Sequence, residues 1–369
     1  MAAPWYTIAN ADEVPSPALL VYLDRAAENI RRMIACAGSA ERLRPHVKTH
    51  KTAELTRMQL AAGISRFKCS TIAEAEMVAS AGATDVLLAM SPVGPNIGRF
   101  LCLAAAIPRV SFSTLTDDPE HVRAVAEAAR AAGASVELLV DLDNGMHRSG
   151  IAPDERAFEL YRTIAATPGV RPGGLHVYDG HLRNPDRSSR QVGVDRAFEP
   201  IAALRARLVG AGLPVPRVVA GGTFSFPIHA QRADVELGPG TPVLWDQSYT
   251  TKLPDLDFLP ALVILTRVVS RPAIGQVTLD LGYKALSADN PDPRVALFDL
   301  PDARMVNHSE EHLVVETAAA NRVAVGDVVY GIPWHVCPTV SLHDEMHVVK
   351  QGRVVGTWPI LARRRRLTI

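Results

Sequence analysis

Short apolar runs alternate with longer amphipathic segments over the first two thirds of the chain. The runs have the length and aliphatic content of buried strands, and the segments between them have helical spacing of apolar residues. We predict strands at residues 43–47, 67–70, 85–90, 110–113, 136–142, 174–178, 218–220 and 235–237. The clearest helices are predicted at residues 73–81, 121–132 and 196–208. Eight strands alternating with helices predict an α/β fold of the (β/α)8 TIM-type barrel class.

A doubly wound open sheet is the alternative fold for this pattern. In that fold a glycine-rich Gly-x-Gly-x-x-Gly loop is expected directly after the first strand. Here the first predicted strand leads instead into Lys48-Thr49-His50-Lys51. The barrel is therefore the preferred prediction.

The pattern changes after residue 255. Predicted strands lie at residues 261–271, 276–281, 312–315, 327–330, 346–349 and 354–358, with many turn residues and few helical stretches between them. This texture predicts a separate β-rich domain. We expect the barrel to span residues 25–252 and the β-rich domain to comprise residues 1–24 and 253–369.

Charge and composition narrow the class of protein. The 39 basic and 39 acidic residues balance, which argues against nucleic acid or an anionic membrane as the main partner. No apolar run approaches the roughly 20 residues that span a bilayer, and the first residues lack the pattern of a signal peptide. The 4 cysteines are scattered along the chain and do not form a disulfide framework. We expect a soluble cytoplasmic protein.

Lys48 stands at the end of the first predicted strand, within the sequence Arg-Pro-His-Val-Lys-Thr-His-Lys. Catalytic residues of barrels lie at the C-terminal ends of strands. An amine in this position could form a Schiff base with pyridoxal 5′-phosphate (PLP), which takes up electrons in amino-acid chemistry. A surface lysine is the alternative interpretation, and Lys51 is a rival for the Schiff base.

Two glycine-containing loops follow predicted strands seven and eight. In barrels, these loops commonly bind phosphate through backbone N–H groups that glycine leaves accessible. Either loop alone is typical of an ordinary turn, whereas their joint placement indicates a phosphate site. The candidate phosphate-binding residues are Gly221, Gly222, Thr223, Gly240 and Thr241.

Three further candidates follow predicted strands five and six. Arg148 could donate to the phenolic oxygen of PLP, or it could pair with Asp141 or Asp143. Tyr178 could stack on the cofactor ring or be a core residue. His181 could be a general base or an ordinary surface histidine.

His335 and Cys337 form a His-x-Cys pair in a proline-bounded turn near the C-terminus. Imidazole and thiolate together favour zinc or another late divalent ion. Nearby His343, Asp344 and His347 could supply further ligands or outer contacts. The alternative is a buried cysteine beside a structural histidine.

In their order and spacing, these motifs resemble the D-threonine aldolase and metal-dependent D-serine dehydratase family of fold type III PLP enzymes. The similarity covers nearly the whole chain and ends with Pro-x-His-x-Cys-Pro-Thr-x-x-Leu-His-Asp. It implies Lys48 as the Schiff-base lysine, Arg148 at the cofactor oxygen and Tyr178 against the ring. It also implies a divalent metal on His335 and Cys337. A homodimer is implied too, with active sites where one alanine racemase-like barrel meets the partner's β domain.

The resemblance implies a PLP- and divalent-metal-dependent lyase acting on β-hydroxy-D-amino acids. We expect the D-threonine aldolase type, which yields glycine and an aldehyde, with zinc, manganese or magnesium as the metal. The base histidine of some aldolases has no match at the same spacing, where this chain has Asn184, and His181, three residues earlier, is the candidate base. A dehydratase of D-serine or 3-hydroxy-D-aspartate, which yields a keto acid and ammonia, is the first alternative, and Cys337 favours it. An amino-acid racemase is the second. The racemase branch carries an arginine where this chain has Gly238, which argues against it.

Overall fold

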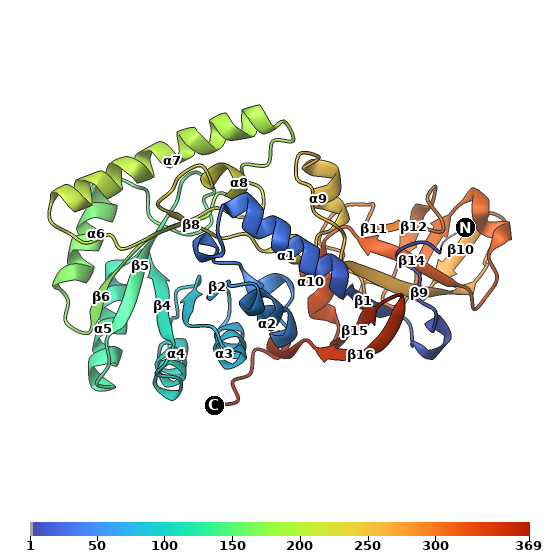
Figure 1. Ribbon diagram of the computed structural model, residues 1–369, viewed down its shortest axis with the longest axis horizontal. Helices are drawn as coiled ribbons and strands as arrows, with labels where there is room; N and C mark the ends of the chain where they lie inside the picture. Colours follow the sequence, from blue (N-terminus) through green and yellow to red (C-terminus); the bar gives the residue numbers. More distant parts are fainter. Residues whose placement is uncertain (1–2) are drawn as a thin grey trace. The chain divides into compact units, whose positions relative to one another are not determined.

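The computed structural model describes residues 3–369, which divide into two compact units (Figure 1). The α/β unit comprises residues 33–48, 53–240 and 364–369, and the β-rich unit comprises residues 3–32, 49–52 and 241–363. Each unit has its own sheet. No helix of the described chain is long and apolar enough to cross a membrane.

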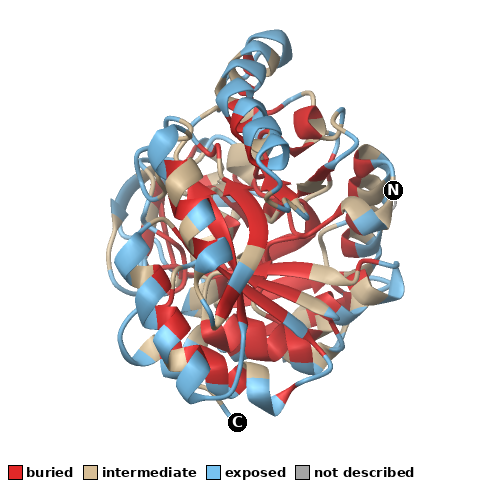
Figure 2. Ribbon diagram, turned by 90° about the vertical axis from the view of Figure 1, so that its left-hand side faces the viewer, coloured by how far each residue is buried: buried red, intermediate tan, exposed pale blue. Residues whose placement is uncertain are grey.

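A parallel sheet of seven strands, in the order β2 to β8, forms the centre of the α/β unit. Figure 2 shows these strands as a buried core inside helices that expose their outer faces. The strands are β2 (Arg66–Cys69), β3 (Asp85–Leu88), β4 (Ser111–Thr116), β5 (Val136–Leu142), β6 (Val170–Val177), β7 (Val218–Ala220) and β8 (Val235–Leu237). The helices are α2 (Ala53–Ala61), α3 (Ile72–Ala81), α4 (Pro95–Ala106), α5 (Pro119–Ala131), α6 (Glu155–Ala166), α7 (Arg187–Gly210) and α8 (Phe226–His229). The predicted barrel-type α/β architecture is confirmed.

The first predicted strand, residues 43–47, is wrong as a regular strand. Leu43 bridges Leu237 of β8 and His46 bridges Lys68 of β2, both in the parallel sense. Pro45 has no N–H group to donate, so a continuous hydrogen-bond ladder cannot form here. The segment nevertheless links the two edge strands of the sheet, and the chain then turns into a short 3-10 helix, Val47–Thr49.

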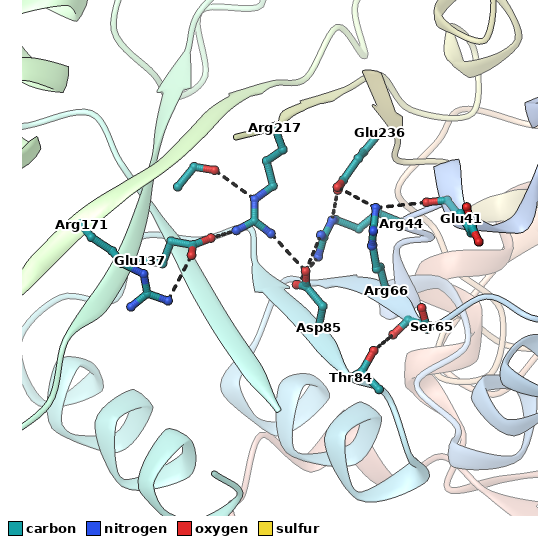
Figure 3. A network of polar contacts seen from close by, with 11 residues as sticks. Glu41, Arg44, Ser65, Arg66, Thr84, Asp85, Glu137, Arg171, Arg217 and Glu236 are labelled. Carbon is teal, nitrogen blue, oxygen red and sulfur yellow. Dashed lines mark hydrogen bonds and ion pairs between the residues drawn. The ribbon is translucent and has the colours of Figure 1, made fainter. Parts of the chain in front are cut away.

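A network of ion pairs crosses the α/β unit near the amino ends of the strands (Figure 3). Arg44, which is fully buried, pairs with Asp85 of β3 at 2.7 Å and with Glu236 of β8 at 2.6 Å. Arg217 pairs with Asp85 at 3.0 Å and also with Glu137 of β5. The network therefore connects β3, β5 and β8, which are not all neighbours in the sheet. It lies at the amino ends of the strands, opposite to their carboxyl ends.

The β-rich unit is built on a sheet of nine strands. β1 (Ala18–Tyr22) lies between β15, to which it is parallel, and β9, to which it is antiparallel. Strands β1, β11 and β12 were missed from the sequence, and the other predicted strands match observed ones within a few residues. The later strands are β9 (Leu262–Ser270), β10 (Gln276–Leu279), β11 (Val295–Leu297), β12 (Arg304–His308), β13 (Leu313–Glu316), β14 (Val328–Pro333), β15 (Glu345–Lys350) and β16 (Arg353–Pro359).

Three helices complete the elements that bear on function. α1 (Leu23–Ala37) follows β1 directly. In the β-rich unit, α9 (Gln247–Lys252) begins after Asp246, and α10 (Val336–Leu342) begins after His335. The predicted His-x-Cys pair therefore stands at the first turn of α10.

Candidate active site

Three basic side chains surround the ring of Tyr178, which directly follows β6. The ring centroid lies 5.6 Å from Nζ of Lys48, 5.9 Å from Nζ of Lys68 and 4.7 Å from Cζ of Arg148. Each comes from a different strand or from the loop after it, so the parallel sheet gathers residues that are distant in the sequence. A small cavity of about 30 Å³, here called the basic cavity, is lined by His46, Lys48, Lys68, Ala89, Arg148, His176 and Tyr178.

The structure thus brings together Lys48, Arg148 and Tyr178, which were predicted from the sequence. Lys51 does not line the basic cavity. The proposed pairing of Arg148 with Asp141 or Asp143 is not observed in residues 3–369, because both carboxylates have other partners. Asp141 accepts hydrogen bonds from His176 and Ser149, and Asp143 binds His147.

Lys68 was missed in the sequence. Its side chain is only 2 % exposed, and it projects from the third residue of β2 into the basic cavity. Burial, and next the charge of Lys48, lower the pKa of Lys68 to about 7. Lys68 could have been identified from the sequence as a lysine inside a short strand that is otherwise predicted to be buried.

His176 of β6 is a second residue that the sequence did not single out. Its Nδ1 donates to Asp141 Oδ1 at 2.7 Å, which orients the ring. Burial lowers the pKa of His176 more than Asp141 raises it, so the ring is neutral and Nε2 is an acceptor. This Nε2 is buried and has no hydrogen-bond partner among residues 3–369. A ligand in the basic cavity could supply that partner.

The glycine loop after β7 packs against the Tyr178 ring. A Cβ atom on Gly222 would lie 2.7 Å from Cε2 of Tyr178, so only glycine fits there without moving the ring. The loop is anchored beneath: Gly222 N donates to Ser225 Oγ at 3.2 Å, and Ser225 Oγ donates to Asp179. Asp179 also binds Nε2 of His229 at 2.8 Å. This buried cluster positions the loop beside the ring of Tyr178.

The remaining phosphate candidates are divided between the two units. Gly221 adopts φ +78°, a conformation that favours glycine. Gly240 N donates to Thr223 Oγ1 at 3.4 Å, which ties the loop after β8 to the loop after β7. Thr241 belongs to the β-rich unit, where its Oγ1 lies 3.9 Å from Cys337 Sγ. His181 is exposed in the loop after β6 and does not line the basic cavity.

His335 and Cys337 interact within the β-rich unit. Burial lowers the pKa of His335, but the hydrogen bond and charge of Cys337, and then those of Asp289, outweigh this effect. The net result is a pKa raised to about 9. Burial raises the pKa of the Cys337 thiol, but His335 lowers it to a net value below its ordinary one. Thr49 Oγ1 lies 3.2 Å from Cys337 Sγ. The pair thus favours a thiolate, the form that binds metal.

Other nearby groups fix this turn. Asp289 Oδ2 lies 2.6 Å from His335 Nδ1, and buried Asp246 accepts hydrogen bonds from Val336 N and Tyr249 N at 3.1 and 2.9 Å. Of the further ligand candidates, His343 donates to the Ala285 carbonyl at 2.8 Å. Asp344 pairs with Arg363 at 2.5 Å, and His347 lies on β15.

The donor sets can be compared with the groups that the sequence implies. The basic cavity offers an amine, a guanidinium and an unpartnered imidazole nitrogen, which fit an anionic PLP. His335 and Cys337 fit two ligands of a divalent ion, because Asp289 occupies Nδ1 and leaves Nε2 for a metal. Across residues 3–369, however, no cluster of three or more His, Cys, Asp and Glu side chains is arranged to hold a metal. Water or substrate would have to complete such a site.

The parallel sheet and the lysine-lined cavity at its carboxyl edge define a protein built on the alanine racemase-type barrel. Family models agree: the alanine racemase N-terminal domain matches residues 21–240, and a putative serine dehydratase domain matches residues 261–349. The chain belongs to the alanine racemase-like family of fold type III PLP enzymes, in its D-threonine aldolase and D-serine dehydratase branch. The family predicted from the sequence is confirmed.

Individual relatives are similar over nearly their whole length. The chain is 32% identical to D-threonine aldolase from an Arthrobacter species, covering 98% of this chain and 95% of that one. The crystal structure of D-threonine aldolase from Filomicrobium marinum matches with a TM-score of 0.89 and 32% identity, over 98% of this chain and 99% of that one. D-threo-3-hydroxyaspartate dehydratase from Delftia sp. HT23 matches with a TM-score of 0.83 and 26% identity, over 95% and 98%.

Proposed function

We propose that the protein is a PLP- and divalent-metal-dependent lyase that cleaves β-hydroxy-D-amino acids to glycine and an aldehyde, as a D-threonine aldolase does. The observation that carries this proposal is the gathering of Lys48, Arg148 and Tyr178 around one basic cavity. A relative that is 32% identical and named D-threonine aldolase supports the same reaction class.

The residues of the α/β unit have distinct roles in this proposal. Lys48 holds the cofactor through its amine, Tyr178 packs against the ring, and Arg148 donates to an oxygen of the ring. Backbone N–H groups of the loops at Gly221 and Gly240 bind the phosphate. When bound, PLP takes up the electrons of a bond broken at the substrate Cα.

His335 and Cys337 are the proposed protein ligands of the metal. Asp289 orients the imidazole of His335, and the buried carboxylate of Asp246 fixes the backbone at Val336 between the two ligands. When bound, the divalent ion acts as a Lewis acid on the hydroxyl oxygen of the substrate. The thiolate favours zinc, although manganese and magnesium are alternatives that add-back experiments separate.

A dehydratase is the second candidate, because the Delftia dehydratase covers the chain at a TM-score of 0.83 and Cys337 is typical of that branch. The two reactions differ in the proton that a base removes. Loss of the hydroxyl proton leads to cleavage of the Cα–Cβ bond, whereas loss of the Cα proton leads to departure of the hydroxyl group. We propose His181 as the base for the hydroxyl proton, from its loop after β6.

The proposal is tested by product formation from D-threonine and D-serine in the presence of PLP. We expect glycine and acetaldehyde from D-threonine, loss of activity after chelation, and recovery with added divalent metal. Pyruvate and ammonia from D-serine, without glycine from D-threonine, would establish the dehydratase instead. Exchange of the α-proton without bond cleavage would indicate a racemase. Light scattering after size exclusion tests the proposed homodimer.

A further inference from the structure

Lys68 is a buried amine that forms no ion pair with any carboxylate of residues 3–369. Its side chain is 2 % exposed, and within residues 3–369 its amine forms no ion pair or hydrogen bond. Its Nζ contacts the Tyr178 ring at 5.9 Å and faces the basic cavity. Buried charges are ordinarily paired, because removing an ammonium from water is expensive. An uncompensated ammonium that faces a cavity therefore indicates an anionic ligand.

The charges that act on Lys68 come from several strands. Lys48 and Arg44 disfavour its charged form, whereas Asp179 and Asp141 favour it more weakly than burial opposes it. The two carboxylates are held by other groups, since Asp179 binds His229 and Ser225 and Asp141 binds His176 and Ser149. The other basic groups that face the basic cavity are His46, Arg148 and His176. Both carboxylates are therefore engaged elsewhere, and their charge only partly offsets the burial of the Lys68 amine.

The loop after β8 is shaped around this amine. A Cβ atom on Gly238 would lie 2.5 Å from Nζ of Lys68 and 3.0 Å from the carbonyl oxygen of Gly221. The Lys68 amine thus extends from β2 to the glycine loops after β7 and β8. Any side chain at position 238 would therefore overlap with the Lys68 amine.

We propose that Lys68 is a further cofactor-binding residue, whose ammonium is neutralised by the anionic cofactor and whose protonation is linked to cofactor binding. This inference rests on the proposed PLP site and adds a residue and a thermodynamic property to it. An anion stabilises the charged amine, so the pKa of Lys68 rises when the ligand binds.

The direction of the pH effect follows from linkage. Below pH 7, Lys68 is already protonated in the empty protein, and its contribution to affinity is constant. Above pH 7, binding must also take up a proton, so this contribution falls by up to about tenfold per pH unit until the pKa of the complex is reached. The ratio of wild-type to Lys68→Met affinity isolates this effect, because titration of the ligand enters both affinities equally.

The probe is 4′-deoxypyridoxine 5′-phosphate, a PLP analogue with a methyl group in place of the aldehyde, which cannot react with lysine. Its affinity is measured by calorimetry from pH 6 to 9 for the wild type and for Lys68→Met. We expect Lys68→Met to bind about tenfold to a hundredfold more weakly at pH 6.5, and the ratio to fall above pH 7. In buffers of different ionisation enthalpy, the wild type at pH 8 is expected to take up more protons than the variant.

Lys350→Met is the matched control, because it removes the charge of an exposed lysine on β15. Its affinity for the analogue is expected to equal that of the wild type. The empty Lys68→Met protein is expected to melt no lower than the wild type, since the substitution removes an uncompensated buried charge. A merely structural lysine would instead lower the melting temperature when it is replaced.

Equal affinities of wild type and Lys68→Met at pH 6.5, or equal proton uptake by the two proteins at pH 8, would overturn the inference. Failure of the proposed function is distinguishable from this result. In that case the wild type would bind neither the analogue nor PLP. If the wild type binds both and the variant is unaffected, the PLP site stands and Lys68 has no part in it.

Discussion

Asp289 Oδ2 accepts a hydrogen bond from Nδ1 of His335 at 2.6 Å, across 46 residues of sequence. Ser287 Oγ donates to the other oxygen of Asp289 at 2.6 Å, so the carboxylate is itself held in place. With Nδ1 engaged by Asp289, Nε2 is the nitrogen of His335 that would bind a metal beside Cys337. A carboxylate behind a histidine in this way fixes the ring and raises its basicity as a metal ligand.

Replacing Asp289 by asparagine is therefore expected to weaken metal binding. The variant Asp289→Asn should lower zinc affinity by about 10- to 100-fold, measured by competition with a chelating dye. Asp292→Asn is the control, because the exposed Asp292 pairs with Arg294 at 3.2 Å and does not contact His335. Equal zinc affinity of Asp289→Asn and the wild type would contradict the proposed role of the pair.

Lys48 is expected to be the residue that PLP modifies. Borohydride reduction of the protein with PLP, followed by peptide mass spectrometry, should locate the pyridoxyl group on Lys48. Lys48→Ala should lose the visible absorbance of bound PLP, whereas Lys51→Ala should keep it, because Lys51 does not line the basic cavity. A modified Lys51 or Lys68 in the wild type would show that the wrong amine has been chosen.

Gly222→Ala is expected to disturb the cofactor site without unfolding the protein. The added Cβ atom would lie 2.7 Å from Tyr178, and overpacking of this kind is worth about 1–3 kcal/mol. PLP affinity should fall by roughly tenfold to a hundredfold, as followed by absorbance titration. Gly210→Ala is the matched control, since a Cβ atom there meets nothing within 4 Å, and it should bind PLP like the wild type.

Arg44 is expected to be important for stability and not directly for chemistry. Arg44→Met would remove the fully buried guanidinium that pairs with both Asp85 and Glu236. Breaking a buried pair by removing one member typically lowers the free energy of unfolding by about 3–5 kcal/mol. Urea denaturation measures this change. Arg57→Met, which removes the pair between exposed Arg57 and half-buried Glu54, should change it by less than about 1 kcal/mol.

Asp85 is expected to make stability depend on pH in acid. Burial raises its pKa, but hydrogen bonds and charge from Arg44, and then Arg217, lower it to a net value below the ordinary one. A depressed folded-state pKa contributes stability above the unfolded-state value, about 3.9, and this contribution is lost as the pH falls towards the folded-state value. Asp85→Asn should be less stable at pH 7 and should show a shallower loss of stability below pH 4. An unchanged acid slope would exclude this contribution.

Several parts of the fold and the site were predictable because they depend on local sequence. The alternation of apolar runs and amphipathic helices reflects burial of strands on both faces of a parallel sheet, so it is visible in one dimension. Lys48, Tyr178, Gly221 and Gly222 were found because they lie at the ends of predicted strands or directly after them. Functional residues of this architecture concentrate at those ends.

Other features were decided by contacts between distant segments. Residues 43–47 have the composition of a strand, but Pro45 interrupts hydrogen bonding and leaves two isolated bridges. In the sequence, nothing separates Lys68 from the other charged residues. In the folded sheet its side chain points inward, near Lys48 and the ring of Tyr178.

By itself, the sequence determined the alternating α/β architecture, the β-rich region, the family and the motifs at strand ends, because periodicity and short-range spacing record them directly. Only the tertiary structure decided which charges are paired. It placed Asp289 on His335, joined Arg44 to Asp85 and Glu236, and left Lys68 without a carboxylate. The physical reason is that desolvation and Coulomb energies depend on distances through space, which positions along the chain do not specify.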